Sequence, residues 1–131
     1  MRFVDTSFWI GLQVPRDAHH QAARAFWLDT SHALITANYV LGETWTFLRR
    51  RAGHQHGLVF LERVAGSQHV TVVCVDEETE REAWTWLRRH DERVSSFVDA
   101  TSFALMRRRG LLEALAFDGD FSAAGFVEVR P

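Results

Sequence analysis

The chain has 131 residues, 47% of them hydrophobic, and a net charge of -2. A chain of this length and composition can bury a core, which excludes disorder, and its charge excludes a global field that attracts nucleic acid. No apolar run approaches the ~20 residues of a membrane span, and the N-terminus lacks a secretory signal pattern. We therefore expect a cytoplasmic protein with no membrane contact. The single cysteine, Cys74, excludes an internal disulfide and, within an apolar run, is expected to be a small buried core residue.

Strands and helices are expected to alternate along the whole chain. Strands are predicted at 2–4, 33–36, 70–75, 112–117 and 126–129, and helices at 6–12, 18–28, 39–51, 55–65, 77–89 and from Ser95 or Ser96 to 109. Asp17, Asn38 and Asp76 precede helices as N-cap residues. Segment 70–75 is β-branched and continuously apolar, which is typical of a buried parallel strand. The alternation predicts an α/β fold with a mainly parallel central sheet, in a single domain over residues 1–131.

All 15 basic residues are arginines, and they concentrate in three runs, 49–51, 88–89 and 107–109. Each run lies near the C-terminus of a predicted helix, where the helix dipole favours cations. The planar guanidinium fork also suits phosphate. Both explanations, stabilisation of the helix end and contact with phosphate, fit these runs.

Four acidic residues stand at positions that need an explanation. Asp5 and Asp118 follow predicted strands, Asp99 lies in the first turn of a helix, and Glu43 shares an apolar helix face with Tyr39, Val40 and Phe47. Each acid has a local explanation: helix capping for Asp5, the helix dipole for Asp99, a turn at Asp118, and an ion pair with an arginine for Glu43.

The four acids also form a joint pattern. A parallel sheet gathers the carboxyl ends of its strands at one edge, where ligands bind. Carboxylates collected there repel one another, and a divalent cation such as Mg²⁺ or Mn²⁺ relieves that repulsion with oxygen ligands. A metal held in this way can activate water and stabilise charge on a phosphodiester. Asp120 is close enough in sequence to contribute.

Four segments, 3–7, 37–44, 97–102 and 116–121, together resemble a PIN-domain ribonuclease of the VapC toxin kind. The resemblance covers essentially the whole chain and implies a PIN-like three-layer α/β/α domain. It implies metal-dependent endonucleolytic hydrolysis of RNA, a cognate antitoxin that blocks the site, and a homodimer.

The resemblance also implies roles for individual residues. The residues that match the acidic quartet of the family are Asp5, Glu43, Asp99 and Asp118. Asp5 and Asp99 would be the main ligands of Mg²⁺ or Mn²⁺, whereas Glu43 and Asp118 would complete the site, bind a second metal or orient the attacking water. Ser7 matches a hydroxyl that assists the first Asp, with Thr6 as the weaker candidate. Ala116 departs from the family pattern, in which a hydroxyl residue often precedes the last acid, and this weakens a second-metal role for Asp118.

Three alternative interpretations of the sequence are less well supported. A non-catalytic PIN-like module that binds RNA or protein would keep the fold but lose an acid, and all four are present. An aspartyl-phosphate phosphohydrolase would need a lysine near Asp5, and the chain contains no lysine. A zinc site is disfavoured because the histidine spacings match none and no cysteine pair accompanies them.

Overall fold

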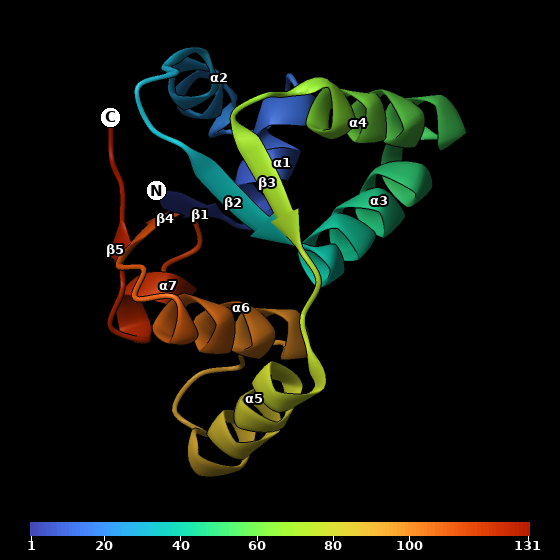
Figure 1. Ribbon diagram of the computed structural model, residues 1–131. Helices are drawn as coiled ribbons and strands as arrows, with labels where there is room; N and C mark the ends of the chain where they lie inside the picture. The colour runs from blue at the N-terminus through green and yellow to red at the C-terminus, as the bar shows by residue number, and fades with distance from the viewer.

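The computed structural model describes all 131 residues, and its centre is one five-stranded parallel sheet in the order β3-β2-β1-β4-β5 (Figure 1). The strands are β1 (Arg2–Val4), β2 (Leu34–Ala37), β3 (Val70–Val73), β4 (Glu113–Leu115) and β5 (Val127–Glu128). The expected α/β class with a mainly parallel sheet is confirmed.

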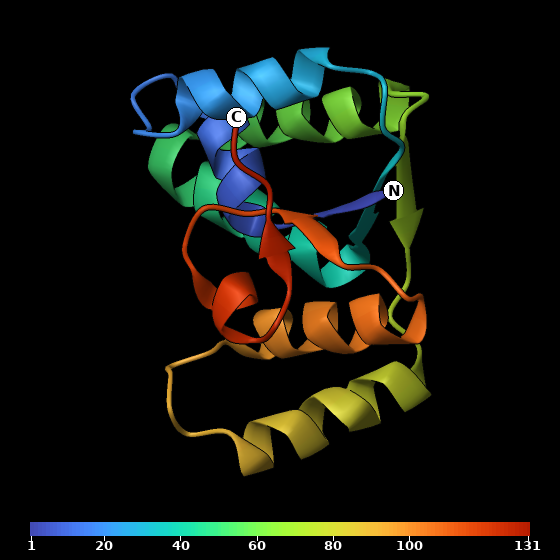
Figure 2. The ribbon, with the colours of Figure 1, turned by 90° about the vertical axis from the view of Figure 1, so that its left-hand side faces the viewer.

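Helices cover both faces of the sheet. They are α1 (Thr6–Gln13), α2 (His20–Leu28), α3 (Asn38–Ala52), α4 (His54–Gly66), α5 (Glu77–Arg89), α6 (Phe97–Arg108) and α7 (Asp120–Ala123). Figures 1 and 2 show α1 to α4 on one side of the sheet and α5 to α7 on the other, with α5 packed outside α6. This confirms the three-layer α/β/α arrangement. None of the seven helices is long and apolar enough to cross a membrane.

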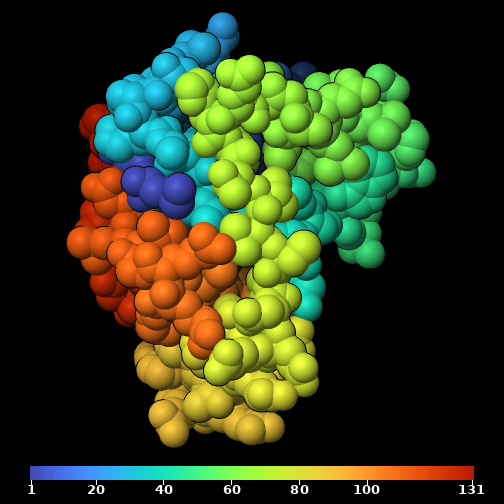
Figure 3. All heavy atoms as spheres, in the orientation of Figure 1, coloured from blue at the N-terminus to red at the C-terminus, as the bar shows by residue number.

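The core lies around β1, the central strand. Phe3 and Val4 on β1 are fully buried, and so are Ile35 on β2 and Trp9 on α1. Because helices cover both faces, successive residues of β1 are apolar rather than alternating with polar ones. The α3–α4 pair projects from this body, as the space-filling view shows (Figure 3).

The strand order places a topological switch point at β1. The chain leaves β1 toward β2 and β3, and then crosses to the other side of β1 to form β4 and β5. Open parallel sheets bind ligands outside the carboxyl ends of the strands that flank such a point. Asp5 directly follows β1, and Asp118 follows β4 by a short loop.

The predicted burial of segment 70–75 is wrong. β3 is an edge strand that pairs only with β2, and Val72 is 43% exposed. Cys74, which follows β3, is exposed rather than part of the core. The apolar run predicted a strand correctly, but an apolar pattern does not distinguish a central strand from an edge strand.

The predicted helix cap at Asp76 is confirmed, because its side chain accepts a bond from the backbone amide of Thr79 (2.8 Å). The predicted caps at Asn38 and Asp17 are wrong. Asn38 is the first residue of α3, and its Oδ1 accepts a bond from the amide of Val75 (2.9 Å), which ties the end of β3 to α3. Helix α2 begins at His20, and Asp17 accepts from the amide of His19 instead of capping the helix. Both side chains satisfy backbone amides outside their helix.

Candidate active site

Asp5 lies at the carboxyl end of β1 and is only 2% exposed. It is the N-cap of α1, so its local explanation holds: its Oδ2 accepts bonds from the backbone amide of Ser7 (3.1 Å) and from the Ser7 hydroxyl (2.7 Å). The pKa of Asp5 is raised to about 7, chiefly by burial and also by the negative charges of Asp118 and Asp99, against the opposing effect of the bonds from Ser7. A capping role alone does not require a carboxylate to be buried beside two others.

Asp99 lies in the first turn of α6 and is buried. It takes part in a capping box, because its Oδ2 accepts from the amide of Ser96 (3.1 Å) and the Ser96 hydroxyl accepts from the amide of Asp99 (3.0 Å). The N-cap itself is Ser96, and Asp99 supports the cap from the first turn of the helix. The pKa of Asp99 is nevertheless raised to about 6, chiefly by burial and also by the charges of Asp118 and Asp120, against the opposing bonds from Ser96.

Asp118 and Asp120 flank Gly119 in the loop after β4. Gly119 has a φ of +84°, a left-handed conformation that side chains with a Cβ rarely adopt, and it lets the chain turn into α7. Asp118 is exposed as a residue, yet partial burial of its carboxyl group raises its pKa, as do the charges of Asp120 and Glu128. Asp120 is paired with Arg93, whose Nη2 and Nε donate to its Oδ1 at 2.7 and 3.0 Å.

The carboxylate of Asp99 on α6 and those of Asp118 and Asp120 after β4 form one acidic group. Oxygens of Asp99, Asp118 and Asp120 lie within 4.8 Å of one another, so one small cation can contact all three. Asp5 is close enough for the charges of Asp99 and Asp118 to act on it. Oxygen donors of this kind fit a hard divalent cation, and its positive charge would favour the ionised form of carboxyl groups whose pKa values are raised by burial and by one another's charges. Asp5, Asp99, Asp118 and Asp120 are called the acidic centre below.

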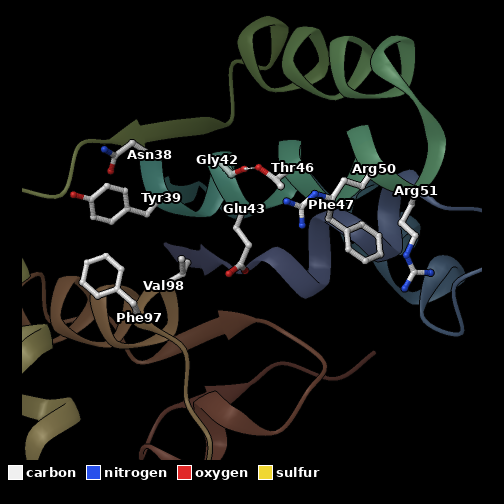
Figure 4. A pocket seen from close by; sticks show the side chains of 10 residues that line it. All are labelled: Asn38, Tyr39, Gly42, Glu43, Thr46, Phe47, Arg50, Arg51, Phe97 and Val98. Atoms are coloured by element: carbon white, nitrogen blue, oxygen red, sulfur yellow. Dashed lines mark hydrogen bonds between the residues drawn. The ribbon is translucent and has the colours of Figure 1, made fainter.

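Glu43, on α3, is not among the carboxylates that the structure brings together in the acidic centre. It lies in a surface groove of about 600 Å³ between α3 and the start of α6, called the α3–α6 groove below (Figure 4). The groove is lined by Asn38, Tyr39, Gly42, Glu43, Thr46, Phe47, Arg50, Arg51, Phe97 and Val98. Figure 4 shows the Glu43 carboxylate directed across the groove, away from the axis of α3. Glu43 forms no ion pair, so the alternative explanation of its position does not hold.

The two hydroxyl candidates differ in their contacts. The Ser7 hydroxyl donates to Asp5 and accepts from the backbone amide of Phe117 (3.0 Å). It therefore links the end of β1 to the chain that follows β4. The Thr6 hydroxyl is buried without any hydrogen-bond partner and does not contact Asp5 through a hydrogen bond.

Sequence reasoning missed two residues that hold this site. Glu128 on β5 has a side chain that is 1% exposed, and it accepts bonds from the amides of Gly119 (3.1 Å) and Ser122 (2.9 Å). Its place between Val127 and Val129 in an alternating pattern predicts a solvent-facing side chain, so nothing in the sequence indicates that Glu128 is buried. Arg93 lies in an irregular loop, and nothing in the sequence connects it to Asp120.

Comparisons with known proteins agree with this geometry. The family model of the PIN domain matches residues 2–127. The chain is 53% identical over 135 residues to the 23S rRNA-specific endonuclease VapC20 of Mycobacterium tuberculosis, covering 100% of this chain and 99% of that protein. The crystal structure of that VapC20, described as a sarcin-ricin loop cleaving toxin, superposes with a TM-score of 0.94 at 53% identity over the whole of both chains.

A more distant structure supports the fold alone. FitAcB from Neisseria gonorrhoeae has a TM-score of 0.67 at 16% identity, covering 100% of this chain and 98% of that one. The match to the family model spans nearly the whole chain, and the relative with 53% identity is matched along its full length. The chain belongs to the PIN-domain family, as its acidic segments predict.

Proposed function

We propose that this protein is the toxin of a VapBC-type toxin–antitoxin pair, an endoribonuclease that hydrolyses phosphodiester bonds of RNA. The observation that carries the proposal is the acidic centre, in which carboxylates from three separate chain segments converge at the switch point of the sheet. The identity of 53% with a 23S rRNA-specific endonuclease over the full chain supports the same reaction.

The acidic centre would hold Mg²⁺ or Mn²⁺. We assign Asp5 and Asp99 as the main ligands, with Glu43 and Asp118 completing the site and Asp120 supporting it. A bound cation of this kind supplies an activated water and stabilises the charge that develops on the phosphate. The protein holds its carboxylates in place before binding, through Ser7 at Asp5 and Ser96 at Asp99. Glu43 stands at the groove wall, where a carboxylate can accept a proton from an attacking water.

The substrate we assign is the sarcin-ricin loop of 23S rRNA. The support is the relative's description as a toxin that cleaves this loop, together with a TM-score of 0.94 over the whole chain. Sequence-specific proteins read RNA mainly in loops whose bases are unstacked, and a stable ribosomal hairpin offers such a loop. The site of action would then be the cytoplasm, where ribosomes lie.

The partners we assign are a cognate antitoxin and a second copy of the chain. An antitoxin would inhibit the enzyme by covering the acidic centre, which is exposed at the surface at Asp118. The chain is co-expressed with the protein encoded by the adjacent gene, and size-exclusion chromatography with light scattering then measures both assemblies directly.

The test compares cleavage of a synthetic sarcin-ricin hairpin by wild-type protein, Asp5→Asn and Asp99→Asn, with Mg²⁺, with Mn²⁺ and with a chelator. We expect cleavage by wild type only when a metal is present, and a loss of at least about 100-fold in both variants. Asp29→Asn is the matched control, since Asp29 is an exposed acid away from the acidic centre. Full cleavage by Asp5→Asn would falsify the proposal, and binding of the hairpin without cleavage by wild type would favour a non-catalytic RNA-binding module.

A further inference from the structure

The α3–α6 groove has two chemically different ends. Tyr39 and Phe97 form one end and Arg50 and Arg51 the other, with Glu43 between them (Figure 4). Tyr39 and Arg50 are 11 positions apart on one helix, so the groove runs for roughly 16 Å at 1.5 Å per residue. That length spans a few nucleotides of an RNA chain.

The cationic end carries two arginines without acidic partners. Arg50 and Arg51 are exposed and form no ion pair, whereas Arg93 and Arg108 on other elements are paired with carboxylates. The Arg51 guanidinium lies 5.1 Å from the centre of the Phe47 ring, a cation–π contact that holds it at the groove. Both guanidinium groups are therefore available to bind a phosphate in the groove.

The aromatic end is a supported ring. Phe97 is half-buried and stacks against Trp84, with ring centres 4.5 Å apart and an angle of 28°. Tyr39 contacts the same ring at 5.5 Å and is itself fixed, because its hydroxyl donates to Glu80 (2.8 Å). A ring held in this way stays in place when a planar group stacks on the part that faces the groove.

Glu43 lies in the groove between its two ends. Phe97 and Val98 line the groove from the opposite wall and directly precede Asp99 in α6. A chain lying along α3 thus passes Glu43, which the proposed function assigns to the metal site, between its contact with the aromatic ring and its contact with the arginines.

We propose that the α3–α6 groove binds the RNA chain on both sides of the cleaved bond, with a nucleobase stacked on Phe97 and phosphates bound by Arg50 and Arg51. This deepens the proposed function and rests on it. Proteins bind single-stranded RNA by combining a basic groove with aromatic stacking platforms, and both components are present here. An acidic peptide would pair with the arginines, but its acidic side chains would not stack on the Phe97 ring. RNA carries both phosphates for the arginines and planar bases for the ring, so it matches the whole groove better.

The test of the cationic end measures binding of the sarcin-ricin hairpin to the Asp5→Asn protein, so that the RNA stays intact. Arg50→Ala and Arg51→Ala are compared with Arg49→Ala, which removes the same charge from the same helix end but does not line the groove. Each phosphate contact to a single strand contributes about 0.7 to the slope of log affinity against log salt concentration. We expect that reduction for Arg50→Ala and Arg51→Ala, and a smaller one for Arg49→Ala.

The test of the aromatic end compares Phe97→Leu with Phe97→Tyr. Leucine keeps an apolar side chain but loses the ring face, whereas tyrosine keeps it. We expect Phe97→Leu to weaken binding by roughly 5- to 150-fold, the range for one stacked base, without changing the salt slope. Phe97→Tyr should bind like the parent protein, and thermal melting confirms that all variants are folded.

The outcomes separate this proposal from the proposed function. If wild type cleaves the hairpin but Arg50→Ala and Arg51→Ala match Arg49→Ala, and Phe97→Leu matches Phe97→Tyr, the groove proposal is wrong and the RNA follows another path. If wild type does not cleave any RNA, the proposed function is wrong, and the same binding comparisons still decide whether the groove holds RNA.

Discussion

The hydroxyl of Ser7 lies 2.7 Å from Oδ2 of Asp5 and donates a hydrogen bond to it. The same hydroxyl accepts a bond from the amide of Phe117, 110 positions farther along the chain. One side chain therefore fixes the orientation of the buried Asp5 carboxylate and its place relative to the loop that carries Asp118. We expect both the stability and the activity of the protein to depend on this hydroxyl.

Replacing Ser7 by alanine removes the donor to Asp5 and leaves the amide of Phe117 without its acceptor. We expect the free energy of unfolding in urea to fall by about 1–3 kcal/mol, the cost of unsatisfied buried polar groups, and RNA cleavage to slow. Thr6→Val is the matched control, because the Thr6 hydroxyl is buried without a partner and its removal should be neutral or stabilising. Equal losses in both variants would contradict the specific role of Ser7.

The stability of the metal-free protein should depend on pH through Asp5 and Asp99. Their folded pKa values of about 7 and about 6 lie above the ordinary value of 3.8, so the folded state binds protons more tightly than the unfolded state. This contribution is fully present below the ordinary pKa and is lost as the pH rises through 6 and then 7. We expect the free energy of unfolding in a chelating buffer to fall from about pH 4 to about pH 7 and to level off above that.

Asp5→Asn is the control for that experiment, since it lacks the titrating group of higher pKa and should lose less stability over the same range. Metal binding should release protons near pH 6, because the ligands must be deprotonated. Calorimetric titration with Mg²⁺ in buffers of different ionisation enthalpy counts these protons. A heat that is the same in every buffer would mean that Asp5 and Asp99 are already ionised or do not bind the metal.

Replacing Arg93 by alanine should change metal affinity. Arg93 neutralises Asp120, which belongs to the acidic centre. Without Arg93, the carboxylates of the metal-free acidic centre repel one another more strongly. A bound cation then relieves more repulsion, so the dissociation constant for Mg²⁺ should fall. The pair is partly exposed and screened by solvent, so we expect at most about a fivefold change in calorimetric titration.

Arg81→Ala is the matched control for Arg93, because Arg81 pairs with Glu77 on the exposed surface of α5, outside the acidic centre. It should leave the affinity for Mg²⁺ unchanged. Weaker binding of Mg²⁺ to Arg93→Ala would mean that Arg93 acts by positioning Asp120 rather than by neutralising it.

Replacing Glu128 by glutamine should disturb the acidic centre from outside it. The two carboxylate oxygens accept bonds from the amides of Gly119 and Ser122, and glutamine places a donor where one acceptor was. We expect the free energy of unfolding to fall by about 1–3 kcal/mol and cleavage to slow, because the loop between Asp118 and Asp120 loses its anchor. Glu113→Gln, which affects an ion pair of a half-exposed side chain with Arg2, should have little effect on cleavage.

Much of the fold follows from local patterns in the sequence. Apolar runs with flanking caps predict every strand and six of the seven helices, with ends that differ by a few positions. The short helix α7 has no counterpart among the predicted helices, because its four residues are too few to show a helical period. The burial of β3 and Cys74 was predicted wrongly, since burial depends on which strand lies at the edge.

The alternating α/β pattern is visible in the sequence as local changes in hydrophobicity, and so are the strand ends and the helix start that carry Asp5, Asp118 and Asp99, whereas Glu43 stands out as an acid on an apolar helix face. Which acids meet depends on the tertiary structure. It joins Asp120, a sequence neighbour of Asp118, to the acidic centre, pairs it with Arg93 and buries Glu128 beneath the loop. These contacts depend on strand order and on the path of the loops, and both are set by the packing of the whole core rather than by any local pattern.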